Sequence, residues 1–251
     1  MRVFAKSDVG KAREINEDYF FISEPTDEVQ IFILADGMGG YNGGEVASNL
    51  ATQAAKSYIL NNFNKIEHSK ESILKLIKNA VEYANMIVYE KSKKDKEIEG
   101  MGTTIEVCLI YNNKVYIGHV GDSRVYRLRK EFFRKLTKDH SYVEQLIEDG
   151  TISKEEAYYH PKKNMLTKAL GCTAFVEPDC LVKGFLKGDI LLISSDGLTN
   201  MIKDEEIYNI IKNNPEKAVD ELVEKANQNG GYDNITVIII LWGEFYYDFR
   251  G

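Results

Sequence analysis

Four aspartates in this sequence stand where an apolar run meets a turn. Asp36, Asp122 and Asp196 each follow such a run, and Asp233 directly precedes one. A strand end holds a side chain more firmly than a free loop does, so these positions suit a preorganised site. Carboxylate oxygens are the ligands that Mg²⁺ and Mn²⁺ prefer in proteins. The pattern therefore predicts a site for hard divalent cations.

Each of these aspartates also has a simpler interpretation. An Asp-Gly pair after a strand is commonly just a turn, Asp122 could cap a local turn, and Asp233 could begin a strand. The joint occurrence of four such residues favours a metal site, and Glu17 and Asp18 add two further carboxylates. Two ions about 3.5–4 Å apart could share one carboxylate and one bridging water, which would lose its proton near neutral pH.

The histidines argue against zinc. His68, His119, His140 and His160 show neither HxH nor HxxxH spacing, whereas zinc sites are built mainly from histidine and cysteine. The expected metal is therefore hard and octahedral, and it should keep several waters.

Two neighbouring features could bind a phosphate group. The glycine-rich segment 36–40 resembles a phosphate loop only weakly, because it matches neither GxxxxGK[ST] nor GxGxxG. Its glycines more simply let a backbone carbonyl approach a metal. Arg13 could grip a phosphate in bidentate fashion, or it could form a surface ion pair with Glu14 or Glu17. The residues alone leave both interpretations of Arg13 open.

The composition describes an ordinary globular chain. It has 251 residues, a formal net charge of −7, and lysines spread along predicted helix faces, so nucleic acid is not an expected partner. The longest apolar stretches, such as 235–242, are too short to span a bilayer, and the first residues carry no secretion signal. Three cysteines without a CxxC pair suit the cytoplasm, with Cys108 as a buried small residue.

Hydrophobic periodicity predicts strands, then helix pairs, without strict β-α-β alternation. In the helix expected at 45–62, the apolar stripe would comprise Val46, Leu50, Ala54 and Tyr58. Segment 139–171 should hold only short helical pieces. The pattern favours one α+β domain of antiparallel sheet with helices outside. The expected strands are 1–8, 18–24, 29–35, 103–111, 114–120, 124–129, 175–183, 189–194 and 234–242, and the other expected helices are 69–91, 204–213 and 215–228.

Eight motifs in a fixed order carry a family resemblance over about residues 2–241. The chain resembles the metal-dependent serine/threonine protein phosphatases of the PPM or type 2C class, in their compact bacterial form. The motifs are Arg13-x-x-Asn-Glu-Asp18, Ala35-Asp-Gly-Met-Gly-Gly40, Gly44-Glu-x-Ala-Ser48, Gly100-Met-Gly-Thr-Thr104, Gly121-Asp-Ser-Arg124, Leu136-Thr-x-Asp-His140, Ser195-Asp-Gly-Leu198 and Asp233-Asn234.

The resemblance implies an α+β fold, a four-layer α-β-β-α sandwich with two central antiparallel sheets flanked by pairs of helices. Residues 1–251 would form a single type 2C phosphatase domain, with a flap subdomain at about 141–170 beside the active site. The flap would influence the choice of substrate.

The resemblance also implies roles for the site residues. Two Mn²⁺ or Mg²⁺ ions would bind, with a possible third, weaker one. Asp36 would bridge the pair, the Gly37 carbonyl would contact one ion, and Asp196 and Asp233 would hold the other. Asp122 would serve the third ion together with Asp196. The remaining site residues are Asp18 and Glu17, which would position metal-bound waters, and Arg13, which would bind the substrate phosphate.

One position departs from many eukaryotic relatives, which carry a histidine directly after the Asp-Gly pair. Here that residue is Met38, whose thioether cannot donate a proton. A metal-bound water or another group must then be the general acid. His119 and His140 are candidates, and each could equally be a structural histidine.

The expected enzyme hydrolyses phosphoserine and phosphothreonine in proteins by in-line attack of a metal-bridging hydroxide. No cysteine has the CxxxxxR spacing of a thiol phosphatase. The alternatives are a catalytically inactive module that binds phosphoproteins and a phosphatase of small phosphate esters. The expected partners are phosphorylated proteins and a cognate serine/threonine kinase, with no nucleic acid and no membrane, and the chain is expected to be a cytoplasmic monomer active in signal transduction.

Overall fold

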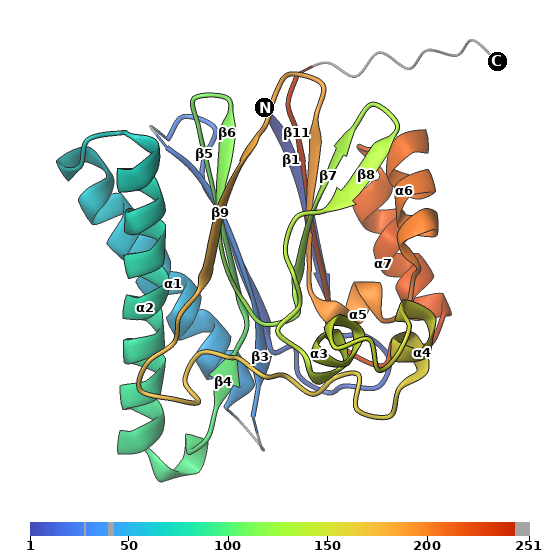
Figure 1. Cartoon of the computed structure of the whole chain (residues 1–251), viewed down its shortest axis with the longest axis horizontal. Helices are drawn as coiled ribbons and strands as arrows, with labels where there is room; N and C mark the ends of the chain where they lie inside the picture. The colour runs from blue at the N-terminus through green and yellow to red at the C-terminus, as the bar shows by residue number, and fades with distance from the viewer. Residues whose placement is uncertain (28, 40–42, 244–251) are drawn as a thin grey trace.

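The computed structural model describes residues 1–27, 29–39 and 43–243 of the chain (Figure 1). Gly40 of the glycine-rich motif lies outside the described residues. The strands are β1 Arg2–Asp8, β2 Asp18–Ile22, β3 Gln30–Met38, β4 Gly102–Thr103, β5 Ile105–Tyr111, β6 Lys114–Val120, β7 Arg124–Arg129, β8 Phe132–Lys135, β9 Asp179–Gly184, β10 Ile190–Ser194 and β11 Ile235–Leu241. The helices are α1 Gly44–Asn62, α2 Lys70–Lys94, α3 Tyr142–Glu148, α4 Lys154–Tyr159, α5 Asp196–Thr199, α6 Asp204–Asn213 and α7 Ala218–Gln228.

Two antiparallel sheets form the centre of the molecule. One sheet has the order β2-β3-β5-β6-β9, with β4 paired to β3, and the other has the order β1-β11-β10-β7-β8. Figure 1 shows α1 and α2 covering the outer face of the first sheet and α6 and α7 covering the second. The predicted α+β class and four-layer sandwich are confirmed.

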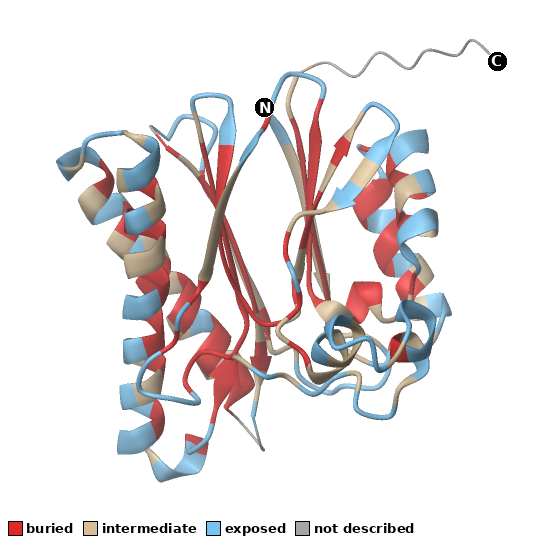
Figure 2. Ribbon diagram, viewed as in Figure 1, coloured by how far each residue is buried: buried red, intermediate tan, exposed pale blue. Residues whose placement is uncertain are grey.

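Three apolar cores lie between these four layers. Alternate residues of β11 serve two of them: Val237 and Ile239 pack towards the outer helices, while Ile238 and Ile240 pack between the sheets. A strand buried on both faces needs a continuous apolar run, which explains the sequence of β11. Figure 2 shows this burial along the central strands. Cys108 lies in the inter-sheet core, as expected.

The face of helix α1 that is buried differs from the apolar face predicted from the sequence. Its fully buried residues include Ala47, Ala51, Ala55 and Ile59, whereas Val46, Leu50 and Tyr58 are only partly buried. Small residues on the inner face let the helix approach the sheet closely, and the larger apolar side chains lie at the margins. Size, rather than hydrophobicity alone, therefore selects the buried face.

Several predicted boundaries were wrong. Strand β3 continues through Asp36 to Met38, so the Asp-Gly pair belongs to the strand and is not a turn. Strand β9 begins at Asp179 rather than 175, and α7 begins at Ala218 rather than 215. Strands β4 and β8 and the single helical turn α5 were not predicted, because elements this short have little periodicity. The hairpin at Asn112-Asn113 is confirmed by φ values of 52° and 59°.

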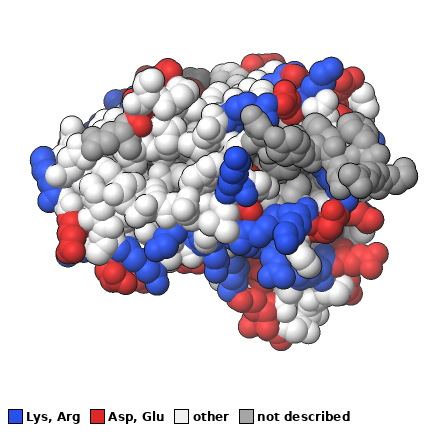
Figure 3. All heavy atoms as spheres, turned by 90° about the horizontal axis from the view of Figure 1, so that it is seen from above, with Lys and Arg blue, Asp and Glu red and all other residues white. Residues whose placement is uncertain are grey.

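Cationic side chains gather at the end of the sandwich opposite α3 and α4. Figure 3 shows a group of Lys and Arg residues on this end. This patch departs from the even spread of cations expected from the sequence. In the described part of the chain, no helix combines the length and apolarity needed to cross a bilayer.

Candidate active site

The predicted carboxylates meet at one end of the two sheets. Asp18 and Asp36 are direct partners in the β2–β3 register. Asp122 follows β6, Asp196 follows β10 and Asp233 precedes β11. Because neighbouring strands run antiparallel, these strand ends all lie on the same side. Burial raises the pKa of Asp36 well above its ordinary value, and the charges of the other four aspartates raise it further.

Asp36 is fixed through its backbone. Its N–H donates to Thr104 Oγ1 at 3.0 Å, and its carbonyl oxygen accepts from the Thr104 N–H and from Thr103 Oγ1, each at 2.9 Å. The next residue, Gly37, allows a close approach of three segments, since an added Cβ would lie 2.2 Å from the Gly44 carbonyl oxygen and 2.6 Å from that of Glu17. Glycine is required at position 37 because a side chain would collide with these backbone atoms, and not because the backbone has a positive φ.

Asp196 stands at the first position of α5, where Gly197 again allows close packing. A Cβ on Gly197 would lie 2.0 Å from the Asn234 carbonyl oxygen. Asn200 Nδ2 donates to Asp196 Oδ2 at 2.8 Å. Burial raises the pKa of Asp196 to about 6, and the nearby Asp233 contributes to that rise. Both Asp-Gly pairs thus bring a carboxylate to a tightly packed backbone junction.

Asp18 carries an oxygen without a partner. Ser195 Oγ donates to its Oδ2 at 2.8 Å, while its Oδ1 is buried and has no hydrogen-bond partner among the described residues. Burial raises the pKa of Asp18 to about 7 despite the bonds from Thr236 and Ser195. A buried carboxylate oxygen without a donor, amid crowded carboxylates, is chemically suited to a cation or to a water that a cation holds.

The donor set fits hard divalent ions that retain water. Among the described residues, no three His, Cys, Asp or Glu side chains are grouped as ligands of a single ion. Mg²⁺, and Mn²⁺ with it, is commonly bound through one or two carboxylates with water completing the octahedron. The carboxylates are therefore suitable as a sparse ligand set rather than as a closed cage.

Arg13 lies at the edge of this cluster. Its Nη2 donates to Asp233 Oδ2 at 2.9 Å, and its side chain is 48% exposed. The ion pair is with Asp233, so the alternative of a surface ion pair with Glu14 or Glu17 is wrong. Burial raises the pKa of the Glu17 carboxyl, and Arg13 opposes that rise. Glu17 is held by its N–H, which donates to Asn234 Oδ1 at 2.8 Å.

Asp122 lies beside Asp196 rather than at the centre of the cluster. Burial raises its pKa well above the ordinary value, and Asp196 and Asp139 add to that effect. Arg124 is committed elsewhere, because its guanidinium binds the Asp139 carboxylate at 2.7–3.1 Å. Asp122 thus shares its surroundings mainly with Asp196.

The two candidate histidines make structural contacts. His119 is fully buried, with Nδ1 on the Glu106 carboxylate and Nε2 2.7 Å from the Lys138 carbonyl oxygen. His140 Nδ1 accepts from the Gly121 N–H at 3.1 Å, and its Nε2 lies 3.3 Å from Asp179 Oδ1. The rings stack with centroids 4.5 Å apart. This arrangement favours the structural interpretation of both histidines.

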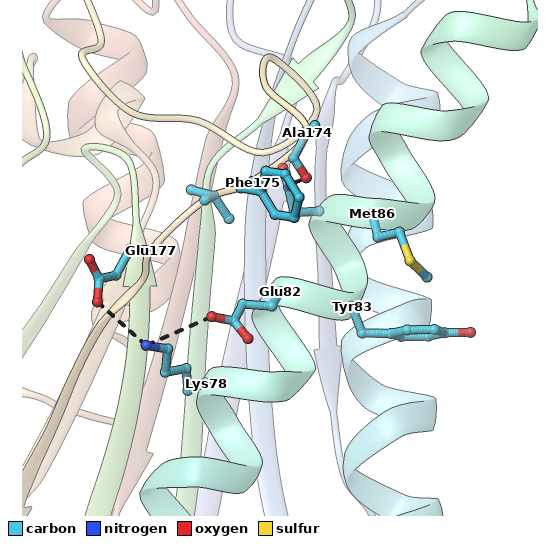
Figure 4. Close-up of a pocket in the computed structure, with 9 residues that line it drawn as sticks. Lys78, Glu82, Tyr83, Met86, Ala174, Phe175 and Glu177 are labelled. Carbon is cyan, nitrogen blue, oxygen red and sulfur yellow. Dashed lines mark hydrogen bonds and ion pairs between the residues drawn. The ribbon is translucent and has the colours of Figure 1, made fainter.

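A cavity of about 810 Å³ opens next to the carboxylates. Asp122 and Asp196 lie on one side of it, and residues of α3, α4 and the segment after α4 line the other. A second cavity, of about 660 Å³, lies between α2 and residues 174–177 (Figure 4) and is lined by none of the predicted site residues. The first cavity is the one that belongs to the site.

Sequence reasoning missed the polar residues that support the carboxylates. Thr103 and Thr104 hold Asp36, Ser195 holds Asp18, and Asn234 holds the Glu17 backbone. Each lies within a quoted motif. Ser195 and Asn234 directly adjoin an acidic residue, while Thr103 pairs with Gly37 and Thr104 bonds to Asp36 across the strands. In the sequence, a hydroxyl or amide residue next to a predicted site carboxylate could have indicated such a supporting residue.

Comparison with known proteins identifies the class. A family model described as "Protein phosphatase 2C" matches residues 10–236. The chain therefore belongs to the protein phosphatase 2C family.

Similar proteins agree in sequence and in fold. The serine/threonine phosphatase stp of Listeria monocytogenes serotype 4b is 39% identical over 238 residues, covering 94% of this chain and 93% of that protein. Stp1 from Staphylococcus aureus has a similar structure, with a TM-score of 0.88, 33% identity and coverage of 96% and 95%. So does the PstP catalytic domain in complex with 2 manganese ions, with a TM-score of 0.81, 33% identity and coverage of 95% and 96%. The predicted family and assignment as a serine/threonine protein phosphatase are confirmed.

Proposed function

We propose that this phosphatase hydrolyses phosphoserine and phosphothreonine in proteins at the carboxylate cluster, with two bound Mn²⁺ or Mg²⁺ ions. The observation that carries this proposal is the convergence of five aspartates from five strand ends, with the unpartnered Asp18 Oδ1 among them. The manganese in the similar PstP structure supports the choice of metal. When bound, such ions lower the pKa of a shared water and offset charge on the phosphoryl oxygens.

The aspartates would divide the metals between them. Asp36, at the centre, would hold both ions, and the Gly37 carbonyl would contact one. Asp196 and Asp233 would hold the other ion. Asp122 would serve a weaker third ion together with Asp196, whose charge acts on it.

The remaining residues would handle water and phosphate. Asp18 is held by Ser195, so its free oxygen would position a water held by the metal, and Glu17 would do the same from the adjacent position. Arg13 keeps most of its guanidinium donors available while Asp233 orients it. Those donors grip the substrate phosphate and stabilise the charge that builds on it. Neither Met38 nor the two engaged histidines supplies the leaving-group proton, which leaves metal-bound water for that role.

The surroundings of the enzyme follow as part of this proposal. Residues 141–170 form a flap over the site within a single phosphatase domain. Phosphorylated proteins are the substrates, a cognate serine/threonine kinase opposes the enzyme in signal transduction, and the chain acts as a monomer. Cys108, Cys172 and Cys180 are all free, which suits the reducing cytoplasm.

The test is hydrolysis of a phosphothreonine peptide under metal control. Chelation should abolish phosphate release and Mn²⁺ should restore it. Asp233→Asn should remove most activity without unfolding the chain, whereas Asp220→Asn, an exposed change on α7, should leave it intact. Full activity of Asp233→Asn would contradict the proposal. Rates on phosphopeptides well above those on small phosphate esters would exclude a phosphatase of small phosphate esters. Tight Mn²⁺ binding together with turnover would exclude a catalytically inactive module that only binds phosphoproteins.

A further inference from the structure

The cavity beside the carboxylates is larger than a phosphorylated side chain needs. Its volume of about 810 Å³ falls in the range of specific ligand pockets, roughly 300–1,000 Å³. Beyond Asp122 and Asp196 its lining includes Tyr158, Lys163 and Lys203. A phosphorylated side chain fills only part of this space, so neighbouring residues of the substrate must contact the rest.

Two lysines in this cavity share one aromatic platform. Lys163 Nζ lies 5.3 Å from the centroid of the Tyr158 ring, and Lys203 Nζ lies 5.8 Å from it. Such contacts orient an ammonium group without neutralising its charge.

Neither ammonium is paired within the described residues. No carboxylate oxygen among those residues lies within 4.0 Å of Lys163 or Lys203. Lys135, on the same cavity, differs: it lies 3.1 Å from Asp139 and 3.9 Å from Glu144. The cavity therefore contains two ammonium groups that have no direct carboxylate partner in the described part of the chain, although the charge of Lys163 also acts on Asp196.

The platform is tied to the catalytic cluster. The Tyr158 hydroxyl donates to the Asn200 carbonyl oxygen at 3.1 Å. The Asn200 side chain in turn donates to Asp196 Oδ2 at 2.8 Å and to Asn164 Oδ1 at 3.4 Å. The two lysines consequently keep a defined position relative to the phosphate site.

We propose that Lys163 and Lys203 bind an anionic side chain of the substrate, close to the phosphorylated residue in its sequence. The group is a carboxylate or a second phosphate, both of which accept charge-assisted hydrogen bonds from lysine. Acidic or multiply phosphorylated segments are then the preferred substrates. This inference rests on the proposed function and specifies its substrate class.

The experiment uses a set of phosphothreonine peptides and the full chain with Mn²⁺. One peptide has only neutral flanking residues. The others carry a single glutamate, or a single phosphoserine, at each position from three before to three after the phosphothreonine. The readout is kcat/KM for phosphothreonine, by mass-resolved products, for the wild type, Lys163→Gln, Lys203→Gln and the double variant. Lys183→Gln, exposed on β9 and outside this cavity, is the matched control.

For at least one position of the anionic residue, kcat/KM of the wild type should be about threefold to thirtyfold higher than for the neutral peptide, as expected for one or two partly exposed ion pairs. The double variant should reduce that preference to near onefold, with the neutral peptide within about twofold of wild type and Lys183→Gln unchanged. Raised salt should reduce the preference in the wild type alone. The glutamate and phosphoserine arms separate the two sources of the anion.

Equal rates on neutral and anionic peptides would overturn the inference while leaving the proposed function intact. A preference that survives in the double variant would overturn the role of these lysines. Failure of the wild type to hydrolyse any peptide would instead overturn the proposed function itself.

Discussion

The carboxylate cluster and the helical side of the adjacent cavity, called here the acidic wall and the flap wall, differ in how they are built. Asp122 and Asp196 are the aspartates of the cluster that line this cavity. The acidic wall is carried by strand ends: Asp36 and Asp18 pair within a sheet, and hydroxyl groups and backbone bonds fix them in place. The opposite wall is carried by α3 and α4, which are 7 and 6 residues long, with Ala157 as the one buried residue in those helices. The acidic wall is preorganised for chemistry by the sheets, whereas the flap wall consists of short helices with little burial of their own.

The largest effect is expected at the centre of the acidic wall. Asp36→Asn should lower kcat/KM for a phosphothreonine peptide by about 10³-fold or more, because the metal pair provides several kcal/mol of transition-state stabilisation. Its melting temperature should not fall, since the change removes one of several crowded negative charges. Activity within tenfold of the wild type would show that this wall is not where the chemistry occurs.

A buried pair beneath the acidic wall should control stability. His119→Ala leaves the Glu106 carboxylate buried without its partner and should lower the free energy of unfolding by about 3–5 kcal/mol. Glu106→Gln should cost less, because the amide can donate to Nδ1 while Nε2–H keeps its bond to Lys138. Urea unfolding of both variants measures the difference. Equal losses, or none, would show that the pair does not support this end of the sheet.

Within the acidic wall, Asp122 is expected to matter less than Asp36. Asp122→Ala should reduce kcat by about tenfold to a hundredfold, the range typical of groups that support a metal site. Calorimetry should still show the first two Mn²⁺ ions, because Asp122 lies beside Asp196 at the side of the cluster. Loss of both ions in this variant would mean that the central pair depends on Asp122.

The smallest effect concerns His140, which joins the two walls. Its backbone N–H donates to the Gly121 carbonyl oxygen at 2.7 Å, and the proposed flap segment begins at the next residue. Burial, with the nearby charges of His119 and Lys168, lowers the His140 pKa from 6.5 to about 4 although Asp179 opposes this shift. The unfolded chain therefore takes up a proton as pH falls below about 6.5, and the folded chain does not.

This linkage has a defined sign. The stability that His140 contributes is present above pH 6.5 and is lost as pH falls towards 4. Replacing it in His140→Asn should narrow the gap in unfolding free energy between wild type and variant from pH 7 to pH 5. Urea unfolding at the two pH values measures that gap. A gap that widens on acidification would contradict the assigned protonation state.

The sequence predicted the acidic wall better than the flap wall, for physical reasons. Asp36, Asp196 and Asp233 adjoin long apolar runs, whose periodicity determines where strands end and which end of the sheet they share. The alternative ion pair of Arg13 with Glu14 or Glu17 was wrong, because its partner Asp233 is remote in sequence and reaches it only through folding. Likewise, nothing local links Tyr158 to Lys203 or to Asn200, since these contacts join separate short elements.

The central claim is that the converging aspartates bind a pair of divalent ions needed for phosphopeptide hydrolysis. The most direct measurement is a calorimetric titration of the metal-stripped enzyme with Mn²⁺, with phosphate release from a phosphothreonine peptide followed at each addition. We predict that two ions bind tightly per chain and that activity rises with their occupancy. The Asp36→Asn variant should show neither the tight two-ion binding nor the rise in activity. Full activity before any Mn²⁺ is bound, or unchanged two-ion binding in Asp36→Asn, would contradict the account.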